Sequence, residues 1–348
     1  GNSREDLIKL FLDYLETLYS ETMSALKSCE VDFNNPPPIA QMIVSVNDVP
    51  LGTQGNLLCV TGGEGTGKSN YVAALIAGAI RHSGTDVDAL GVTLHENSKN
   101  KAVLFYDTEQ SEVQLYKNIS NLLRRCGREA MPEWFKAYCL TGMSRKERLL
   151  SIIQSLDKYH YQYGGVHLVV IDGIADLIKC ANDEAESIAV VEELYRLAGI
   201  YKTCIVTVLH FIPNGLKLRG HLGSELQRKA AAILSIEKDS DPAVSVVKAL
   251  KVRDGSPLDV PIMQFSWDKE KAIHVYLGEK PKEEKLVAVA KEVFSRKRFV
   301  TYVELAEEIQ SILEVKERTA KSYIRFMREK EIILKSSDNQ SYYVIGNF

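Results

Sequence analysis

"GGEGTGKSN", residues 62–70, fits the spacing G-x-x-x-x-G-K-[ST]. In that pattern backbone N–H groups cradle phosphates, the lysine reaches the outermost phosphates, and the final hydroxyl holds Mg²⁺. An apolar run at 56–61 precedes the stretch and a helix-compatible run at 71–80 follows it, which is the strand, loop and helix order that the motif needs. The sequence therefore predicts a loop that binds ATP and Mg²⁺ through Gly62, Gly63, Glu64, Gly65, Thr66, Gly67, Lys68, Ser69 and Asn70.

The composition is that of a soluble globular protein long enough for two domains, with 348 residues, 45% hydrophobic and 26% charged, and a net charge of −3. No stretch approaches the apolar length of a membrane span, and the N-terminus is not a signal peptide. Six scattered cysteines without a C-x-x-C pair indicate reduced thiols rather than zinc ligands or disulfides. We expect a cytoplasmic protein with no membrane partner.

Residues 1–45 predict an N-terminal helical arm and a linker. Apolar residues at three- and four-residue spacing indicate an amphipathic helix over 5–29, and Asn34-Asn-Pro-Pro-Pro38 stops any helix. Two arrangements stay open for the arm, which packs either on a neighbouring subunit or on its own domain.

Between residues 46 and 277, apolar runs alternate with helical patterns, which predicts an α/β domain with a mostly parallel sheet flanked by helices. The polar stretch 84–101 is expected to be a surface loop. Strands are expected at 57–61, 102–107, 166–172, 203–210, 231–237 and 245–251.

After a linker at 278–284, residues 285–348 predict a winged helix-turn-helix domain. The pattern comprises helices at 286–294, 302–313 and 317–331 and short strands at 332–335 and 341–345.

The third of these helices has two distinct sides. The residues expected to face its core are Ala320, Tyr323, Ile324 and Met327, whereas the basic and polar side carries Arg318, Lys321, Ser322 and Arg325. The basic side fits the major groove of duplex DNA, and binding of a protein instead stays open.

Three carboxylates stand at or just beyond strand ends, where an open parallel sheet gathers its ligands. Asp172 closes an apolar run in the Walker B arrangement and is expected to hold Mg²⁺ together with Ser69. The next residue is Gly173, so the adjacent catalytic glutamate of many P-loop ATPases is missing. Asp107 and Glu109 end the neighbouring run, and Glu109 becomes the best candidate for polarising the attacking water.

The order of these motifs resembles a known class. The phosphate-binding loop is followed by "LFYDTEQS", "VVIDGIADL", "LRGHLGSELQRKA" and "KALKVRDGSP", which together look like the RecA/DnaB class. Within it, residues 46–277 are most similar to the RepA-type replicative helicases of plasmids and mobile elements. The resemblance implies a RecA-like core that hydrolyses ATP between subunits of a ring, usually a hexamer, and moves single-stranded DNA through its centre.

The resemblance also implies roles for single residues. His210 matches the polar sensor after the fourth strand, which couples the γ-phosphate to the DNA loops. The alternative is a histidine that only has its hydrogen bonds satisfied at a strand end. Either Arg219 or Arg253 would reach a nucleotide of the neighbouring subunit; contact of Arg219 with DNA, or a solvated charge on an exposed turn at either position, is the alternative. We favour Arg253, which follows Lys251 in "KVRDG".

A basic stretch follows the sensor strand and includes Lys217, Arg219 and His221. Cations beside a glycine-containing turn suit contact with a DNA backbone, because phosphate neutralisation supplies most nonspecific affinity. A solvated loop without a DNA partner is the alternative.

The sequence thus predicts an ATP-hydrolysing DNA helicase or translocase that acts in the replication or mobilisation of a mobile element. Two alternatives stay open. An ATP-gated DNA-binding regulator or partition factor would bind duplex DNA at specific sequences, and a KaiC-like or recombinase-like DNA-dependent ATPase would act on DNA without unwinding it.

Overall fold

The computed structural model describes residues 3–210, 220–280 and 282–348, and the chain separates into two compact units, 1–40 and 41–348. The first unit contains α1 (Arg4–Ser28), which begins with a capping box between Ser3 and Asp6. The predicted helix is therefore present. None of its residues is buried, and its apolar side chains, among them Leu10 and Phe11, are largely exposed.

The second unit begins with a large α/β region. Its elements are β1 (Met42–Val46), β2 (Val49–Thr53), β3 (Asn56–Gly62), α2 (Lys68–Ile80), β4 (Thr93–Leu94), β5 (Ala102–Asp107), α3 (Glu112–Arg125), β6 (Phe135–Cys139), α4 (Arg145–Gln162), β7 (Val166–Asp172), η1 (Ile174–Leu177), α5 (Glu184–Ile200), β8 (Cys204–Leu209), α6 (Gly220–Lys229), β9 (Ala232–Lys238), β10 (Val244–Val252), η2 (Pro257–Asp259), β11 (Ile262–Asp268) and β12 (Ile273–Lys280).

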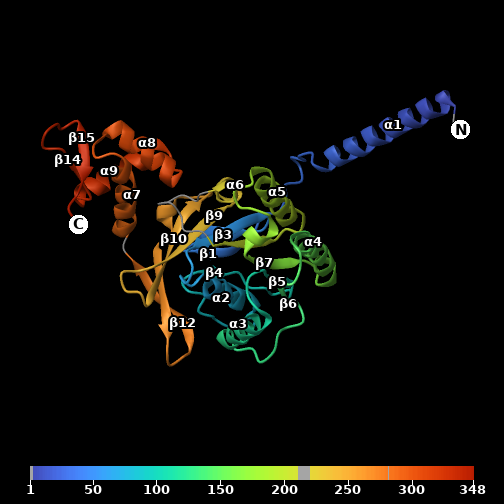
Figure 1. Cartoon of the computed structure of the whole chain (residues 1–348), viewed down its shortest axis with the longest axis horizontal. Coiled ribbons are helices and arrows are strands. Elements are labelled where there is room, and N and C mark those ends of the chain that lie inside the picture. Colours follow the sequence, from blue (N-terminus) through green and yellow to red (C-terminus); the bar gives the residue numbers. More distant parts are fainter. Residues whose placement is uncertain (1–2, 211–219, 281) are drawn as a thin grey trace. The chain divides into compact units, whose positions relative to one another are not determined.

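Within the described part of the chain, the main sheet has nine strands in the order β12-β11-β10-β9-β3-β8-β7-β5-β6. The strands from β9 to β6 in this order run parallel, and β10, β11 and β12 extend the sheet in antiparallel fashion. Helices α2 and α3 cover one face, and α4, α5 and α6 cover the other (Figure 1). This is the predicted α/β core with a mostly parallel sheet.

Burial on both faces explains why the central strands are apolar throughout. In β3, Leu58 and Val60 point into the cluster with α2 and α3, whereas Leu57 and Cys59 point into the cluster with α4 and α5. The parallel strands bring their carboxyl ends to one edge of the sheet, so residues that follow β3, β5, β7 and β8 meet there.

All six expected strands are present, and β5 and β7 have the expected bounds. Two expectations about the remaining segments and one about a domain boundary were wrong. The stretch 84–101 is not simply a surface loop, because Leu90 and Leu94 are buried and β4 pairs with β1. The stretch 278–284 is not a free linker, because β12 continues to Lys280 and α7 begins at Lys282. The expected boundary at 45/46 also cuts through β1.

The C-terminal module, residues 282–348, has its own apolar cluster. As expected, Ala320, Tyr323, Ile324 and Met327 are buried in it, and Leu258 from η2 joins them. A small sheet has the order β13-β15-β14. The elements are α7 (Lys282–Arg296), β13 (Val300–Thr301), α8 (Tyr302–Leu313), α9 (Glu317–Glu329), β14 (Ile333–Lys335) and β15 (Tyr342–Ile345).

Among the helices of the described residues, none combines the length and the apolar character that crossing a membrane requires.

A buried lysine at the start of the module makes stability depend on pH. Lys285 is 2% exposed, its ammonium group donates to the carbonyl oxygen of Pro257, and burial lowers its pKa to about 7. The Lys285 ammonium group has a higher pKa in the unfolded chain than in the folded protein. Burial of the charged group therefore lowers the free energy of unfolding fully below pH 7, and this loss disappears as the pH rises towards the pKa of the unfolded chain. Between pH 7 and 9 we expect the free energy of unfolding of the wild type to rise by about 2 kcal/mol relative to Lys285→Met.

Denaturant unfolding of both proteins at the two pH values measures this difference. Equal pH dependence of wild type and Lys285→Met would show that the ammonium group is hydrated in the folded protein.

Candidate active site

The loop between β3 and α2 carries the phosphate-binding spacing at the edge where the parallel strands end. Gly62 has φ 156°, and a Cβ atom there would lie 2.3 Å from the carbonyl oxygen of Ile236 on β9, so only glycine fits. Two hydrogen bonds fix the loop, because the Thr66 hydroxyl donates to the Gly63 carbonyl oxygen (2.9 Å) and the Ser245 hydroxyl donates to the Thr66 carbonyl oxygen (2.8 Å). The loop is therefore closed on itself at Gly63 and tied to β10 at Thr66.

Helix α2 begins directly after the loop, with Gly67 as its N-cap in a left-handed conformation. The first N–H groups of a helix have no partner within the helix, so this end is suited to an anion. Lys68 is only 3% exposed, and its ammonium group donates to the Gly63 carbonyl oxygen. Burial lowers the pKa of Lys68, and the negative charges of Asp172 and Glu109 offset part of this shift.

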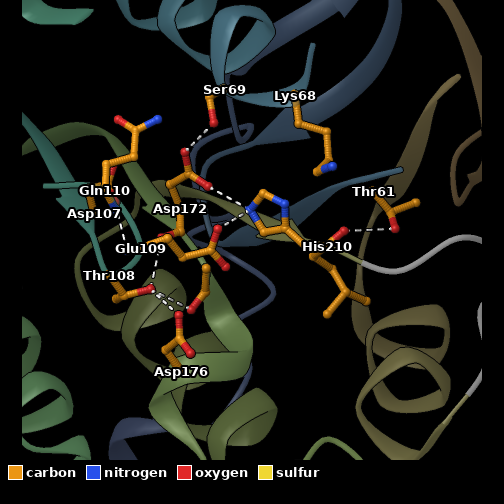
Figure 2. Close-up of polar contacts among 12 residues, drawn as sticks. Thr61, Lys68, Ser69, Asp107, Thr108, Glu109, Gln110, Asp172, Asp176 and His210 are labelled. Atoms are coloured by element: carbon orange, nitrogen blue, oxygen red, sulfur yellow. Dashed lines mark hydrogen bonds and ion pairs between the residues drawn. The ribbon is translucent and has the colours of Figure 1, made fainter. Parts of the chain in front are cut away.

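Side chains from three strand ends meet beside this loop (Figure 2). Glu109 follows β5, Asp172 ends β7 and His210 follows β8. The His210 Nε2 atom lies 2.6 Å from Glu109 Oε2 and 3.2 Å from Asp172 Oδ1. The sheet register explains the meeting, because Asp107 pairs with Asp172 across β5 and β7.

The position of His210 gives it a positive charge at neutral pH. Burial by itself would lower the pKa of His210, but hydrogen bonds to Asp172 and Glu109 outweigh that effect and raise the pKa to about 9. The strand end before His210 is fixed as well, because the Thr61 hydroxyl donates to the Leu209 carbonyl oxygen (3.0 Å). The imidazolium group thus joins the two carboxylates.

The residues present fit a magnesium ion. The Ser69 hydroxyl donates to Asp172 Oδ2 at 3.0 Å, so two oxygen ligands stand side by side at the start of α2. Mg²⁺ prefers oxygen ligands and keeps several waters, which matches a serine and an aspartate. Glu109, Asp172 and His210 also have ligand atoms within 4.8 Å of one another, but an imidazole nitrogen does not suit Mg²⁺.

Asp107 shapes the turn that carries Glu109. Its buried Oδ1 atom accepts the backbone N–H groups of Glu109 (2.8 Å) and Gln110 (2.9 Å). Burial raises the pKa of Asp107 to about 6, although these two hydrogen bonds act in the opposite direction. The sequence marked Asp107 as a strand-end carboxylate, but only the structure shows that it positions Glu109.

Gly173 makes room for that turn. It has φ 103°, and a Cβ atom there would lie 2.2 Å from Thr108 Oγ1 and 2.9 Å from Glu109 Cγ. Thr108 Oγ1 in turn lies 2.9 Å from Asp176 Oδ2 and 3.0 Å from the carbonyl oxygen of Asp172. Many P-loop ATPases carry a glutamate at the position of Gly173. Here a glycine is needed at that position because it leaves room for Thr108 and Glu109, which follow the neighbouring strand β5. Thr108 and Asp176 were not identified from the sequence.

Arg253 lies far from the phosphate-binding loop of its own chain. Its Nη2 atom donates to the Lys229 carbonyl oxygen (2.7 Å), and Nη1 donates to Asn56 Oδ1 (3.3 Å). Asn56 begins β3 and Gly62 ends it, so the two ends of this strand are separated by about 20 Å at roughly 3.3 Å per residue. The exposed guanidinium group is at the opposite edge of the sheet.

Lys251, two residues earlier, is buried. Its ammonium group donates to the carbonyl oxygens of Gln227 and Arg228, and burial lowers its pKa. It anchors the end of α6 and does not project outwards. Lys217 and Arg219 lie outside the described residues.

The remaining candidates for DNA contact are exposed. His221 lies in the first turn of α6. On α9, Arg318, Lys321 and Arg325 lie on the side opposite the buried residues, and Lys321 forms an ion pair of 2.8 Å with Glu317. Contact of these residues with DNA stays a prediction.

The arrangement as a whole defines a class. A glycine-rich loop with a buried lysine suits phosphates, the neighbouring oxygens suit Mg²⁺, and a glutamate held by its own turn stands close to both. This combination is typical of a P-loop ATPase. An AAA domain family matches residues 21–214, more than half of the chain, and the chain belongs to this family. It is an ATPase of the AAA type.

The chain is also similar to a solved structure that is described as an ATPase domain, at 15% identity and a TM-score of 0.40, with 65% of this chain and 86% of that chain covered. No curated protein matches it.

Proposed function

We propose that this ATPase is a DNA translocase or helicase of the RepA/DnaB type, which works as a homo-oligomeric ring on the DNA of a mobile element. The observation that carries the proposal is the contact of His210 with both Glu109 and Asp172. His210 directly follows β8, and the basic residues Lys217, Arg219 and His221 follow within the next eleven positions. A change at the γ-phosphate would therefore reach His210, from which the chain continues into the candidate DNA segment.

In the proposed cycle the phosphate-binding loop takes the β- and γ-phosphates. Lys68 exchanges its bond to the Gly63 carbonyl oxygen for a phosphate oxygen, and the first N–H groups of α2 donate to the same group. Ser69 and Asp172 would hold Mg²⁺, which when bound neutralises charge on the β- and γ-phosphates.

Glu109 acts as the base in this proposal. Its turn is fixed by Asp107, and its carboxylate contacts His210, which orients it. A carboxylate held in this way beside the γ-phosphate would accept a proton from the attacking water.

Arg253 would serve the neighbouring subunit. Its position at the opposite edge of the sheet excludes a role at its own phosphate-binding loop and supports a role at the loop of an adjacent copy. A ring in which each subunit presents one edge to the next creates such composite sites. Arg219 remains the second candidate for this cation.

Two surfaces would contact DNA. Single-stranded DNA would bind the segment with Lys217, Arg219 and His221, and duplex DNA would bind the exposed side of α9 in a winged-helix module. The basic side of α9 also favours a second candidate function, an ATP-gated regulator that recognises duplex DNA without moving along it.

Steady-state ATP hydrolysis with and without single-stranded DNA, at two salt concentrations, tests the proposal. We expect several-fold stimulation that weakens with salt, because contacts to phosphates release counterions. Turnover indifferent to single strands, together with tight sequence-specific duplex binding, would support the regulator instead.

A further inference from the structure

The loop after Arg253 is built into the core of the C-terminal module. Leu258 is buried in the apolar cluster of that module. The hydroxyl groups of Ser256 and Tyr323 form a buried hydrogen bond of 2.9 Å, although 67 positions separate them. Lys285, near the start of α7, donates to the carbonyl oxygen of Pro257. Helices α7 and α9 thus both contact the loop.

The anchored end of the loop has a fixed shape. Ser256 Oγ accepts the N–H group of Leu258 (3.2 Å), and Asp259 Oδ2 accepts the N–H group of Ser256 (2.9 Å). This reciprocal pair is a capping box that stabilises η2. A shift of Tyr323 therefore moves the start of η2 as a unit.

Arg253 lies between two anchors. Its own N–H group donates to the carbonyl oxygen of Ala231, just before β9 (2.7 Å). Only Asp254 and Gly255 separate Arg253 from Ser256, so the far anchor is at most about 10 Å of extended chain away. The backbone of Arg253 is thus held on one side at Ala231 and on the other at Ser256, while its guanidinium group contacts Lys229 and Asn56.

We propose that the C-terminal module positions Arg253 for the nucleotide of the neighbouring subunit, through the hydrogen bond between Tyr323 and Ser256. Tyr323 and Ser256 are positioning residues in this proposal, which rests on the proposed role of Arg253. The outer side of the same helix carries Arg318, Lys321 and Arg325. A ligand bound to that side would therefore contact the helix whose Tyr323 bonds to Ser256, three positions after Arg253.

Mixed oligomers test the proposal. Glu109→Gln subunits lack the base but present Arg253, and Arg253→Ala subunits lack the arginine but keep the base. Mixing them restores ATP turnover only where an Arg253→Ala site meets the arginine of a Glu109→Gln neighbour. Tyr323→Phe, which removes one hydroxyl group and keeps the buried ring, is added to either partner in turn.

The expected result depends on which subunit carries the change. Glu109→Gln/Tyr323→Phe is expected to restore about three- to tenfold less turnover than Glu109→Gln, the range for loss of one hydrogen bond. In the other partner, Arg253→Ala/Tyr323→Phe is expected to give the same recovered turnover as Arg253→Ala, because this subunit only receives the arginine of its neighbour. Tyr343→Phe, a change of another buried tyrosine in the same module, is the matched control and has no effect in either position.

A double-mutant cycle adds a second readout. In a Glu109→Gln/Ser256→Ala subunit, Tyr323→Phe should cause no further loss, because the two hydroxyl groups share one hydrogen bond.

The possible failures are distinguishable. Recovery that is equal with and without Tyr323→Phe in the Glu109→Gln partner overturns the positioning role and leaves the proposed function intact. An equal loss in both partners also overturns it, since the change then acts on the whole subunit. Absence of recovery in the simple mixture overturns the role of Arg253 and the inference together.

Discussion

Glu109→Gln lowers steady-state ATP turnover by about 10²- to 10⁴-fold, the usual contribution of a general base, while ATP affinity stays close to that of the wild type. Glutamine keeps the size of the side chain and can still contact His210, but it cannot accept a proton from water. Lys68, Ser69 and Asp172, which carry the proposed contacts to ATP and Mg²⁺, are unchanged. Steady-state hydrolysis and equilibrium nucleotide binding measure the two quantities separately.

Glu112→Gln is the control for this prediction, because Glu112 is an exposed acid three positions away at the start of α3. It should leave turnover unchanged. Normal hydrolysis by Glu109→Gln would assign the base to another group, and a loss of ATP binding would give Glu109 a role in holding the nucleotide.

The sequence was enough to predict the strands whose carboxyl ends form the site, because these strands are apolar throughout. The bounds of β5 and β7 followed from continuous runs of buried side chains that end in Asp107 and Asp172. Strands β6 and β12 were missed because most of their residues are only partly buried, and their sequences, FKAYC and IHVYLGEK, show no run or alternation strong enough to mark them.

The contacts that prepare the site could not be predicted in the same way. A side chain at Gly173 would collide with Thr108. These residues follow β7 and β5, so the collision depends on the register of the two strands. The sequence showed only that a glutamate was missing at position 173. Likewise, the buried side of α9 was predicted correctly, but the partner of the Tyr323 hydroxyl comes from Ser256 in a distant loop.

Arg253→Ala is expected to lower ATP turnover by about 10³-fold, because a cation that reaches the γ-phosphate from a neighbour stabilises the charge of the transition state. The loss should appear in turnover and leave ATP affinity largely unchanged, since Arg253 lies at the opposite edge of the sheet from its own phosphate-binding loop. Arg196→Ala, which removes an exposed arginine paired with Glu193 on α5, is the control and should retain full turnover.

Mixing distinguishes an arginine that acts on a neighbour from one that acts within its own chain. In an equal mixture with Glu109→Gln, about one quarter of the interfaces in a closed ring join an intact base to an intact arginine, so turnover should recover by a corresponding fraction. An arginine that only supported the fold of its own subunit would give no recovery, because neither kind of subunit is active alone. Full activity of Arg253→Ala would transfer the role to Arg219, and the same mixture with Arg219→Ala would then show the recovery.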